Sequence, residues 1–140
     1  MATLKNERNE STVQFLDTAR EIKQFTREQC LKLPKRFTFF GGQETYVSAS
    51  KVLEKIKKGN SVFPTNKIEY QIRRNYFLEA YAELNNLLEC VAEIRGMYPV
   101  KDTVMLKWIE MIKTELKLVK ALLIKDKERF SRLLSQNDEK

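Results

Sequence analysis

The side chains with the most chemical potential in this chain are cations. Lysine and arginine together number 26 against 19 aspartate and glutamate, and histidine is absent from all 140 residues. Without histidine, the Ser-His-Asp and Cys-His nucleophile systems, His-containing zinc sites and imidazole acid–base chemistry near neutral pH are excluded. Catalysis would have to rest on carboxylates or lysines, which form no recognisable constellation here. We therefore predict that the chain is not an enzyme and uses no cofactor.

The acidic and thiol side chains form no metal or redox motif. Glu79, Glu83 and Glu93 share one predicted helix, but a di-iron site in a helical bundle also needs Glu-x-x-His motifs. We interpret these glutamates as surface charge and predict no bound metal. Cys30 and Cys90 lack CxxC spacing and no apolar leader opens the chain, which favours a reduced, cytoplasmic protein. No stretch approaches the roughly 18 uninterrupted apolar residues of a membrane span, so we predict no membrane partner.

The basic charge is concentrated in three places. The formal net charge of +7 and the isoelectric point near 9.4 attract polyanions such as nucleic acid, anionic lipid or an acidic protein patch. One pair of adjacent basic residues lies at a predicted corner, another lies early in a long predicted helix, and a row at helical spacing lies on a later helix. These candidate contacts for nucleic acid or a partner are Lys35, Arg36, Arg73, Arg74, Lys113, Lys117 and Lys120.

Each basic group also has a structural interpretation. Guanidinium groups bind phosphate or carboxylate through paired hydrogen bonds, so Arg73 and Arg74 could anchor RNA. Either arginine could instead pair with Glu69 or Asp126 across a bundle, and we favour that structural role for at least one of them. The row of lysines is equally consistent with a solvated helix face. The charge pattern alone therefore leaves both roles open.

Aromatic residues near the basic groups also allow two interpretations. Aromatic faces beside cations stack on unpaired bases, but aromatic residues at helical spacing more often fill a bundle interior or a subunit interface. We favour packing for these rings and treat Trp108 as a core or interface anchor. The rings are Phe37, Phe39, Phe40, Tyr76, Phe77 and Tyr81.

The positions of glycine and proline predict the elements that carry these residues. Only 4 glycines and 3 prolines are present, which favours a few long helices over many short strands. Asn66 followed by Glu69 is a capping-box pattern that starts a helix of about thirty residues. The predicted helices run from Ser11 or Thr12 to the corner at Pro34, from near Gly41-Gly42 to Gly59-Asn60, from the Asn66 cap to Gly96, and from an Asp102 cap through Phe130 and Leu134.

Apolar residues recur every three or four positions in each predicted helix, which indicates one buried stripe per helix. The stripe includes Val47 in the second helix, Ile68 and Ile72 in the third, and Ile109 and Leu116 in the fourth. Four amphipathic helices with short connections predict one all-α domain, an antiparallel up-down four-helix bundle. We expect the bundle to cover residues 12–134, with a flexible lead-in at 1–11 and a flexible tail at 135–140.

Five segments together resemble a known family. They are residues 33–40 (LPKRFTFF), 60–66 (NSVFPTN), 69–76 (EYQIRRNY), Trp108-Ile109 and 126–130 (DKERF). As a set, within residues 12–132, they are similar to the accessory variability determinant (Avd) proteins of diversity-generating retroelements. They are also similar to related proteins encoded by ribosomal-RNA intervening sequences.

The resemblance implies a homopentameric ring of four-helix bundles. It also implies a non-catalytic partner of the element's reverse transcriptase that binds RNA or an RNA/DNA hybrid and supports complementary-DNA synthesis. Gly41-Gly42 departs from the helix formers that similar sequences carry there, so we expect the second helix to start late or to kink. The alternative function is a structural or protein-interaction bundle with no nucleic-acid role.

Overall fold

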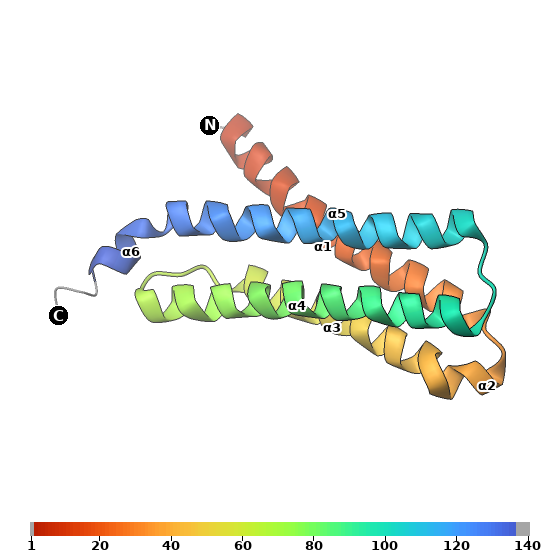
Figure 1. The fold of residues 1–140 in the computed structure, drawn as a ribbon. Coiled ribbons are helices and arrows are strands. Elements are labelled where there is room, and N and C mark those ends of the chain that lie inside the picture. The colour runs from red at the N-terminus through yellow and green to blue at the C-terminus, as the bar shows by residue number, and fades with distance from the viewer. Residues whose placement is uncertain (1, 137–140) are drawn as a thin grey trace.

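The chain folds into helices throughout its described part. The computed structural model describes the backbone of residues 2–136 and the side chains of residues 14–135, and no strand occurs among them. The predicted all-α class is therefore confirmed. The elements, shown in Figure 1, are α1 (Ala2–Leu31), α2 (Lys35–Phe37), the π-helical turn η1 (Thr38–Gly42), α3 (Gln43–Ser61), α4 (Lys67–Met97), α5 (Asp102–Arg129) and α6 (Ser131–Gln136).

The long helices α1, α3, α4 and α5 pack against one another as a bundle. Helix α3 contacts both α1 and α4, and α5 contacts both α4 and α1. In Figure 1, α4 and α5 extend alongside each other, and the first turns of α1 project away from the other helices. Among the described residues, no helix is both long enough and apolar enough to cross a membrane.

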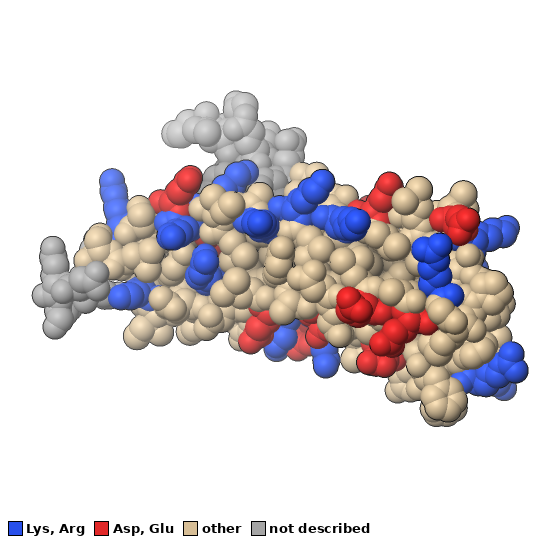
Figure 2. Space-filling view, in the orientation of Figure 1, with Lys and Arg blue, Asp and Glu red and all other residues tan. Residues whose placement is uncertain are grey.

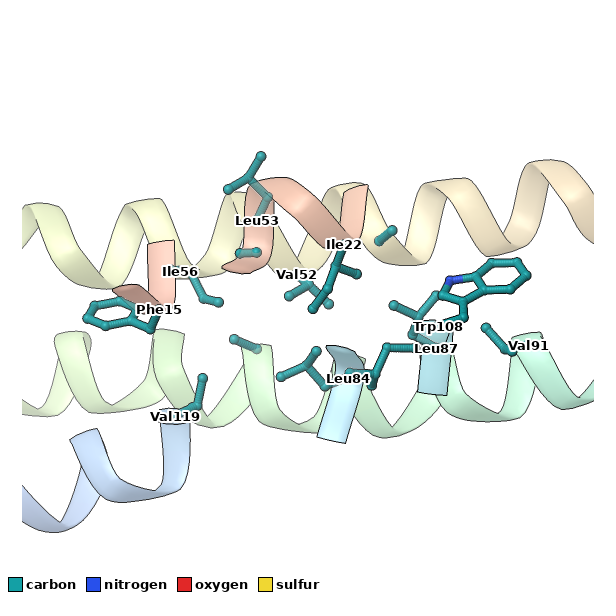
Figure 3. Packing of buried hydrophobic residues seen from close by; sticks show 14 of the residues in the cluster. Phe15, Ile22, Val52, Leu53, Ile56, Leu84, Leu87, Val91, Trp108 and Val119 are labelled. Atoms are coloured by element: carbon teal, nitrogen blue, oxygen red, sulfur yellow. The ribbon is translucent and has the colours of Figure 1, made fainter. Parts of the chain in front are cut away.

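Large apolar side chains from all four long helices meet in one core. Trp108, Phe77 and Ile112 are fully buried, and Figure 3 shows Trp108 beside Leu87 and Val91. The indole N–H of Trp108 donates a hydrogen bond to Thr26 Oγ1 at 2.9 Å, so its one polar atom is satisfied. Each large apolar side chain buried in this way contributes about 1.5–3 kcal/mol to folding. The prediction of Trp108 as a core anchor is confirmed.

The start of α4 follows the predicted cap. Asn66 is in an extended conformation, and its side-chain oxygen accepts a hydrogen bond from the backbone N–H of Glu69 at 2.9 Å. The Glu69 carboxylate accepts bonds from the backbone N–H and the hydroxyl of Thr65, at 2.7 and 2.6 Å, which lower the pKa of Glu69. The reciprocal bond of the capping box thus reaches Thr65, one residue before the cap.

Three helix ends differ from the sequence prediction. Helix α1 begins at Ala2 and not near Ser11. Residues 2–10 lack an apolar period, but they include good helix formers and no proline or glycine, so the helix can extend through them. Asp102 is the first residue of α5 and not its cap, since Lys101 precedes the helix. The helical pattern is interrupted at Phe130, between α5 and α6. Residues 137–140 of the predicted tail lie outside the described residues.

The Gly41-Gly42 pair lies in a distorted helical turn, as expected from its composition. In η1 the backbone N–H of Gln43 donates to the carbonyl of Thr38, five residues earlier, and α3 begins only after this turn. Both glycines are buried, and a Cβ atom on Gly41 would lie 2.6 Å from Met97 Cε. The missing side chain therefore lets the end of α4 approach this turn closely.

Some residues of the predicted stripes lie on the surface. Val47 is 41% exposed, Ile68 is 73% exposed and Ile72 is 43% exposed, so the prediction that they are buried is wrong. Ile68 and Ile72 are one helical turn apart near the start of α4, where the core-facing positions are Tyr70 and Arg73 instead. The apolar period of α4 thus continues onto a second, exposed face.

Candidate nucleic-acid interface

Three lysines lie together on one exposed face of α5. Lys113, Lys117 and Lys120 are exposed, and none of them forms an ion pair with another residue of the described part. Their spacings of four and three residues place them on the same side of the helix over about 10 Å of its axis. Figure 2 shows lysine and arginine side chains along α5. We call Lys113, Lys117 and Lys120 the α5 lysine row.

The surface next to this row has a different charge pattern. In Figure 2, acidic side chains gather over α4, below the basic side chains along α5. Glu79 of α4 pairs with Lys55 of α3 at 3.1 Å, and Glu83 accepts a hydrogen bond from Ser48 at 2.9 Å. These carboxylates are therefore used in contacts between α3 and α4. Lys113, Lys117 and Lys120 of α5 form no such ion pair with another residue of the described part, which leaves their field available to a polyanion.

The corner after α1 carries the second basic group. Pro34 precedes α2 in an extended conformation, and Lys35 and Arg36 occupy the first two positions of that short helix. Both side chains are exposed, and neither pairs with a carboxylate of the described residues. The guanidinium carbon of Arg36 lies 4.9 Å from the centre of the Phe37 ring. Lys35 and Arg36 thus lie where the sequence analysis predicted, at an exposed corner.

Two aromatic rings at this corner contradict the packing interpretation. Phe39 is 82% exposed and Phe40 is 74% exposed, whereas Phe37 is half-buried and contacts Tyr98 with 5.9 Å between ring centres. Phe77, by contrast, is fully buried and confirms the interpretation of packing at its position. Phe39 and Phe40 lie in η1, where the buried positions are occupied by Gly41 and Gly42 instead.

Arg73 is the clearest correction to the candidate set. It is 6% exposed, and its Nε donates to Asp126 Oδ2 at 2.6 Å. Its Nη1 donates to the carbonyl oxygens of Val62 at 3.0 Å and Gly59 at 3.3 Å. The structural alternative, an ion pair with Asp126 across the bundle, is therefore confirmed. Arg73 connects α3, α4 and α5 and is not a surface contact for RNA.

Arg74 differs from its neighbour in both position and partners. Its side chain is partly buried, and its Nη1 atom is buried without a hydrogen-bond partner among the described residues. A guanidinium directed partly into the protein presents less of its hydrogen-bonding edge to solvent. The Arg73-Arg74 pair therefore does not act as one anchor, because the first arginine is committed to Asp126 and the second is only partly accessible.

One buried acid was missed by the sequence analysis. Glu115 is fully buried in α5, and neither of its carboxylate oxygens has a hydrogen-bond partner among the described residues. Burial raises the pKa of Glu115 from 4.5 to about 8. A signal was present, since Trp108, Ile112 and Val119 are buried at spacings that place position 115 on the same face. The predicted stripe included Ile112 and Val119 together with Ile109 and Leu116, and it left out position 115 because its side chain is not apolar.

The remaining reactive groups form no assembled site. Cys30 and Cys90 are free thiols, and burial raises the pKa of Cys30 to about 11, which keeps it protonated and unreactive near neutral pH. Within the described residues, no three cysteine, aspartate or glutamate side chains lie close enough together to hold a metal ion. The candidate functional groups of the described part are thus exposed lysine and arginine side chains on the surface of the helices.

No family model, curated protein or solved structure matches the chain. The similarity to Avd proteins therefore rests on the five sequence segments described above, and its functional content enters as a proposal. Of the seven candidate residues, five lie exposed on the surface and two, Arg73 and Arg74, are buried or partly buried. The exposed set consists of Lys35, Arg36, Lys113, Lys117 and Lys120.

Proposed function

We propose that this protein is a non-catalytic accessory protein of a diversity-generating retroelement. In this role it binds the element's reverse transcriptase and RNA, or an RNA/DNA hybrid, in the cytoplasm and supports complementary-DNA synthesis. The family content of the proposal comes from the sequence resemblance. Its physical content comes from the cations of the described surface, because exposed lysines and arginines without carboxylate partners are the groups that neutralise phosphates.

The observation that carries the proposal is the α5 lysine row. Lys113, Lys117 and Lys120 are exposed, lie on one side of the helix and have no ion-pair partner in the described part of the chain. Glu110 lies one turn before Lys113 but forms no ion pair with it in the described part, whereas Glu54 and Lys58 of α3 pair at 2.9 Å. A polyanion that runs along α5 would meet several cations in succession.

The same proposal includes assembly into a homopentameric ring of up-down four-helix bundles. The mutual packing of α1, α3, α4 and α5 is compatible with such a protomer. Exposed apolar side chains provide surface that a neighbouring protomer could cover, as is common in symmetric oligomers. They include Phe63, Ile68, Ile72, Leu78 and Leu106. Native mass spectrometry of the purified protein tests this part, and a monomer at micromolar concentration would contradict it.

Charge reversal on α5 tests RNA binding directly. We expect Lys117→Glu with Lys120→Glu to weaken binding to RNA by at least tenfold at low salt, since two attractive contacts become repulsive. The matched control is Lys51→Glu with Lys57→Glu, which changes the net charge equally through two exposed lysines of α3. Equal losses from both variants would mean that only net charge matters. No RNA affinity in the unmodified protein, with or without the polymerase, would remove the RNA role.

The runner-up is a structural bundle that binds other proteins and no nucleic acid. The exposed apolar residues of α4 favour it, because Ile68 is 73% exposed one turn before the exposed Ile72. The two functions differ in which substitutions matter. If Ile68→Ser with Ile72→Ser abolishes assembly and the retroelement's activity while the α5 charge reversal leaves that activity unchanged, the structural function is correct.

A further inference from the structure

The corner formed by α2 and η1 presents two phenylalanine rings to solvent. Phe39 is 82% exposed and Phe40 is 74% exposed, which places both rings among the most exposed large apolar residues of the described part. Within that part, neither ring contacts another aromatic ring or lies against a cation. Two consecutive exposed aromatic residues provide apolar surface on which a ligand can pack.

Two cations accompany these rings. Lys35 precedes Phe39 by four residues and Arg36 precedes Phe40 by four residues, and α2 continues directly into η1. Lys35 and Arg36 are both exposed at this corner, and the guanidinium of Arg36 lies against the neighbouring Phe37 ring, 4.9 Å from its centre. Between Glu28 and Glu44 the chain has three basic residues and no acidic residue. This corner therefore combines flat apolar faces with uncompensated positive charge.

A recess beside the corner extends the basic surface. It has a volume of about 250 Å³ and is lined in part by Lys32, Lys101 and Tyr98. Tyr98 also contacts the Phe37 ring, which places the recess next to α2. Lys32 and Lys101 are exposed, and Figure 2 shows basic side chains at the end of the molecule where Figure 1 places α2. Lys32 and Lys101 thus add positive charge at the end of the molecule that carries α2.

We propose that Phe39 and Phe40 form a stacking platform for unpaired RNA bases, with Lys35 and Arg36 holding the adjacent phosphates. Bases stack on aromatic side chains only when they are not paired inside a duplex, so the platform selects single-stranded segments. This inference rests on the proposed function, because both require RNA binding. It adds the form of the RNA and a second contact region distinct from the α5 lysine row.

The charge of the corner favours RNA over a second copy of this chain as the occupant. A two-fold contact between two copies of this corner would bring Lys35 and Arg36 close to the same cations of the other copy, and like charges in an interface oppose association. In a head-to-tail ring the corner would meet a different surface of the next copy, and the oligomeric state of the variants below tests that case. An RNA strand supplies both complements at once, with bases for the rings and phosphates for the cations. A protein partner would need an acidic surface next to an apolar one.

The test separates stacking from simple apolar contact. Leucine preserves apolar volume but cannot stack, so the variant is Phe39→Leu with Phe40→Leu in the full-length protein. Its binding to a short oligouridine and to a blunt RNA duplex of equal length is measured by fluorescence anisotropy. Phe39→Trp with Phe40→Trp keeps flat rings and serves as the rescue. Phe63→Leu, at a ring that is 64% exposed elsewhere in the molecule, is the matched control.

Each phenylalanine-to-leucine substitution should weaken binding to oligouridine by at least about fivefold, and the two losses should multiply in the double variant. Its affinity for the duplex should stay within about twofold of the unmodified protein, and the tryptophan variant should bind oligouridine normally. Full oligouridine affinity in the leucine variant would overturn the proposal. So would equal losses for single strand and duplex. Circular dichroism checks that each variant remains folded.

The outcomes also separate this inference from the proposed function. If RNA binding depends on Lys117 and Lys120 but not on Phe39 and Phe40, the proposed function stands and the stacking platform is wrong. If the leucine variant loses its native oligomeric state instead of its RNA affinity, the corner is an interface between copies of this chain, which also overturns the platform. An unmodified protein that binds neither RNA overturns both.

Discussion

The two ends of the bundle contain similar side chains in opposite states. At the α6 end, where α5 meets α6, Arg73 is enclosed by Asp126 and lies 5.0 Å from the Phe77 ring centre. At the α2 end, where α2 and η1 form a corner, Arg36 and Phe40 face solvent. Arginine and phenylalanine side chains are thus structural at one end and open to a ligand at the other.

The difference comes from one distant carboxylate. Asp126 is 53 positions from Arg73 in the sequence and meets it only because α4 and α5 lie side by side. No acidic residue of the described part pairs with Lys35 or Arg36. Local sequence therefore does not distinguish an arginine that stabilises the fold from one that is free to bind. The tertiary contact with Asp126 determines which role each arginine has.

The largest expected effect comes from removing the buried arginine at the α6 end. Arg73→Ala leaves the buried Asp126 without its cation and should lower the free energy of unfolding by about 3–5 kcal/mol. Arg36→Ala, at an exposed position, should change it by less than about 0.5 kcal/mol. Urea unfolding of the two variants measures both values. If the two losses were equal, the two ends would not differ as described.

A second prediction concerns the middle of the bundle, between the two ends. Glu115 keeps its proton up to a pKa of about 8 when folded and loses it near 4.5 when unfolded. Between these pH values unfolding releases a proton, so the folded state should lose up to about 5 kcal/mol of stability as pH rises from 4.5 to 8. Glu115→Gln should remove this contribution. Unfolding measured across that pH range tests it, and identical pH profiles for the two proteins would contradict it.

Smaller changes in stability are expected from alanine substitutions at one glycine near each end. A Cβ atom on Gly59 would lie 2.9 Å from the Phe77 ring, and that buried ring has little room to move. We expect Gly59→Ala to cost about 1–3 kcal/mol. A Cβ on Gly96 meets nothing within 4 Å, so Gly96→Ala should stabilise the last turn of α4 by up to about 1 kcal/mol. Thermal melts that rank the variants in the reverse order would contradict these contacts.

Elements with local signals were predictable from the sequence. The Asn66 cap and the long helix that it starts followed from the spacing of Asn66 and Glu69, because the hydrogen bonds involved connect residues within one turn. The corner at Pro34 and the late start of α3 after Gly41-Gly42 followed from the backbone properties of proline and glycine. Such signals need no knowledge of the tertiary structure.

Residues whose state depends on distant contacts were predicted less well. The sequence analysis offered the Arg73–Asp126 pair only as one alternative, because no local pattern selects Asp126 over Glu69. It placed Ile68 in the core, since an apolar period does not say which of two apolar faces is covered. It also missed the exposure of Phe40, because the sequence does not show that Gly41 and Gly42 occupy the buried positions of this turn. For the candidate site, the sequence showed which residues are charged but not which of them are exposed to solvent.

The most direct test of the central claim is the salt dependence of RNA binding. If Lys117 and Lys120 contact phosphates of single-stranded RNA, replacing both with alanine should reduce the slope of log affinity against log salt concentration by about 1.4. Replacing Lys51 and Lys57 of α3 with alanine should leave that slope unchanged. A slope unaffected by the α5 substitutions, or affected equally by both pairs, would contradict the account.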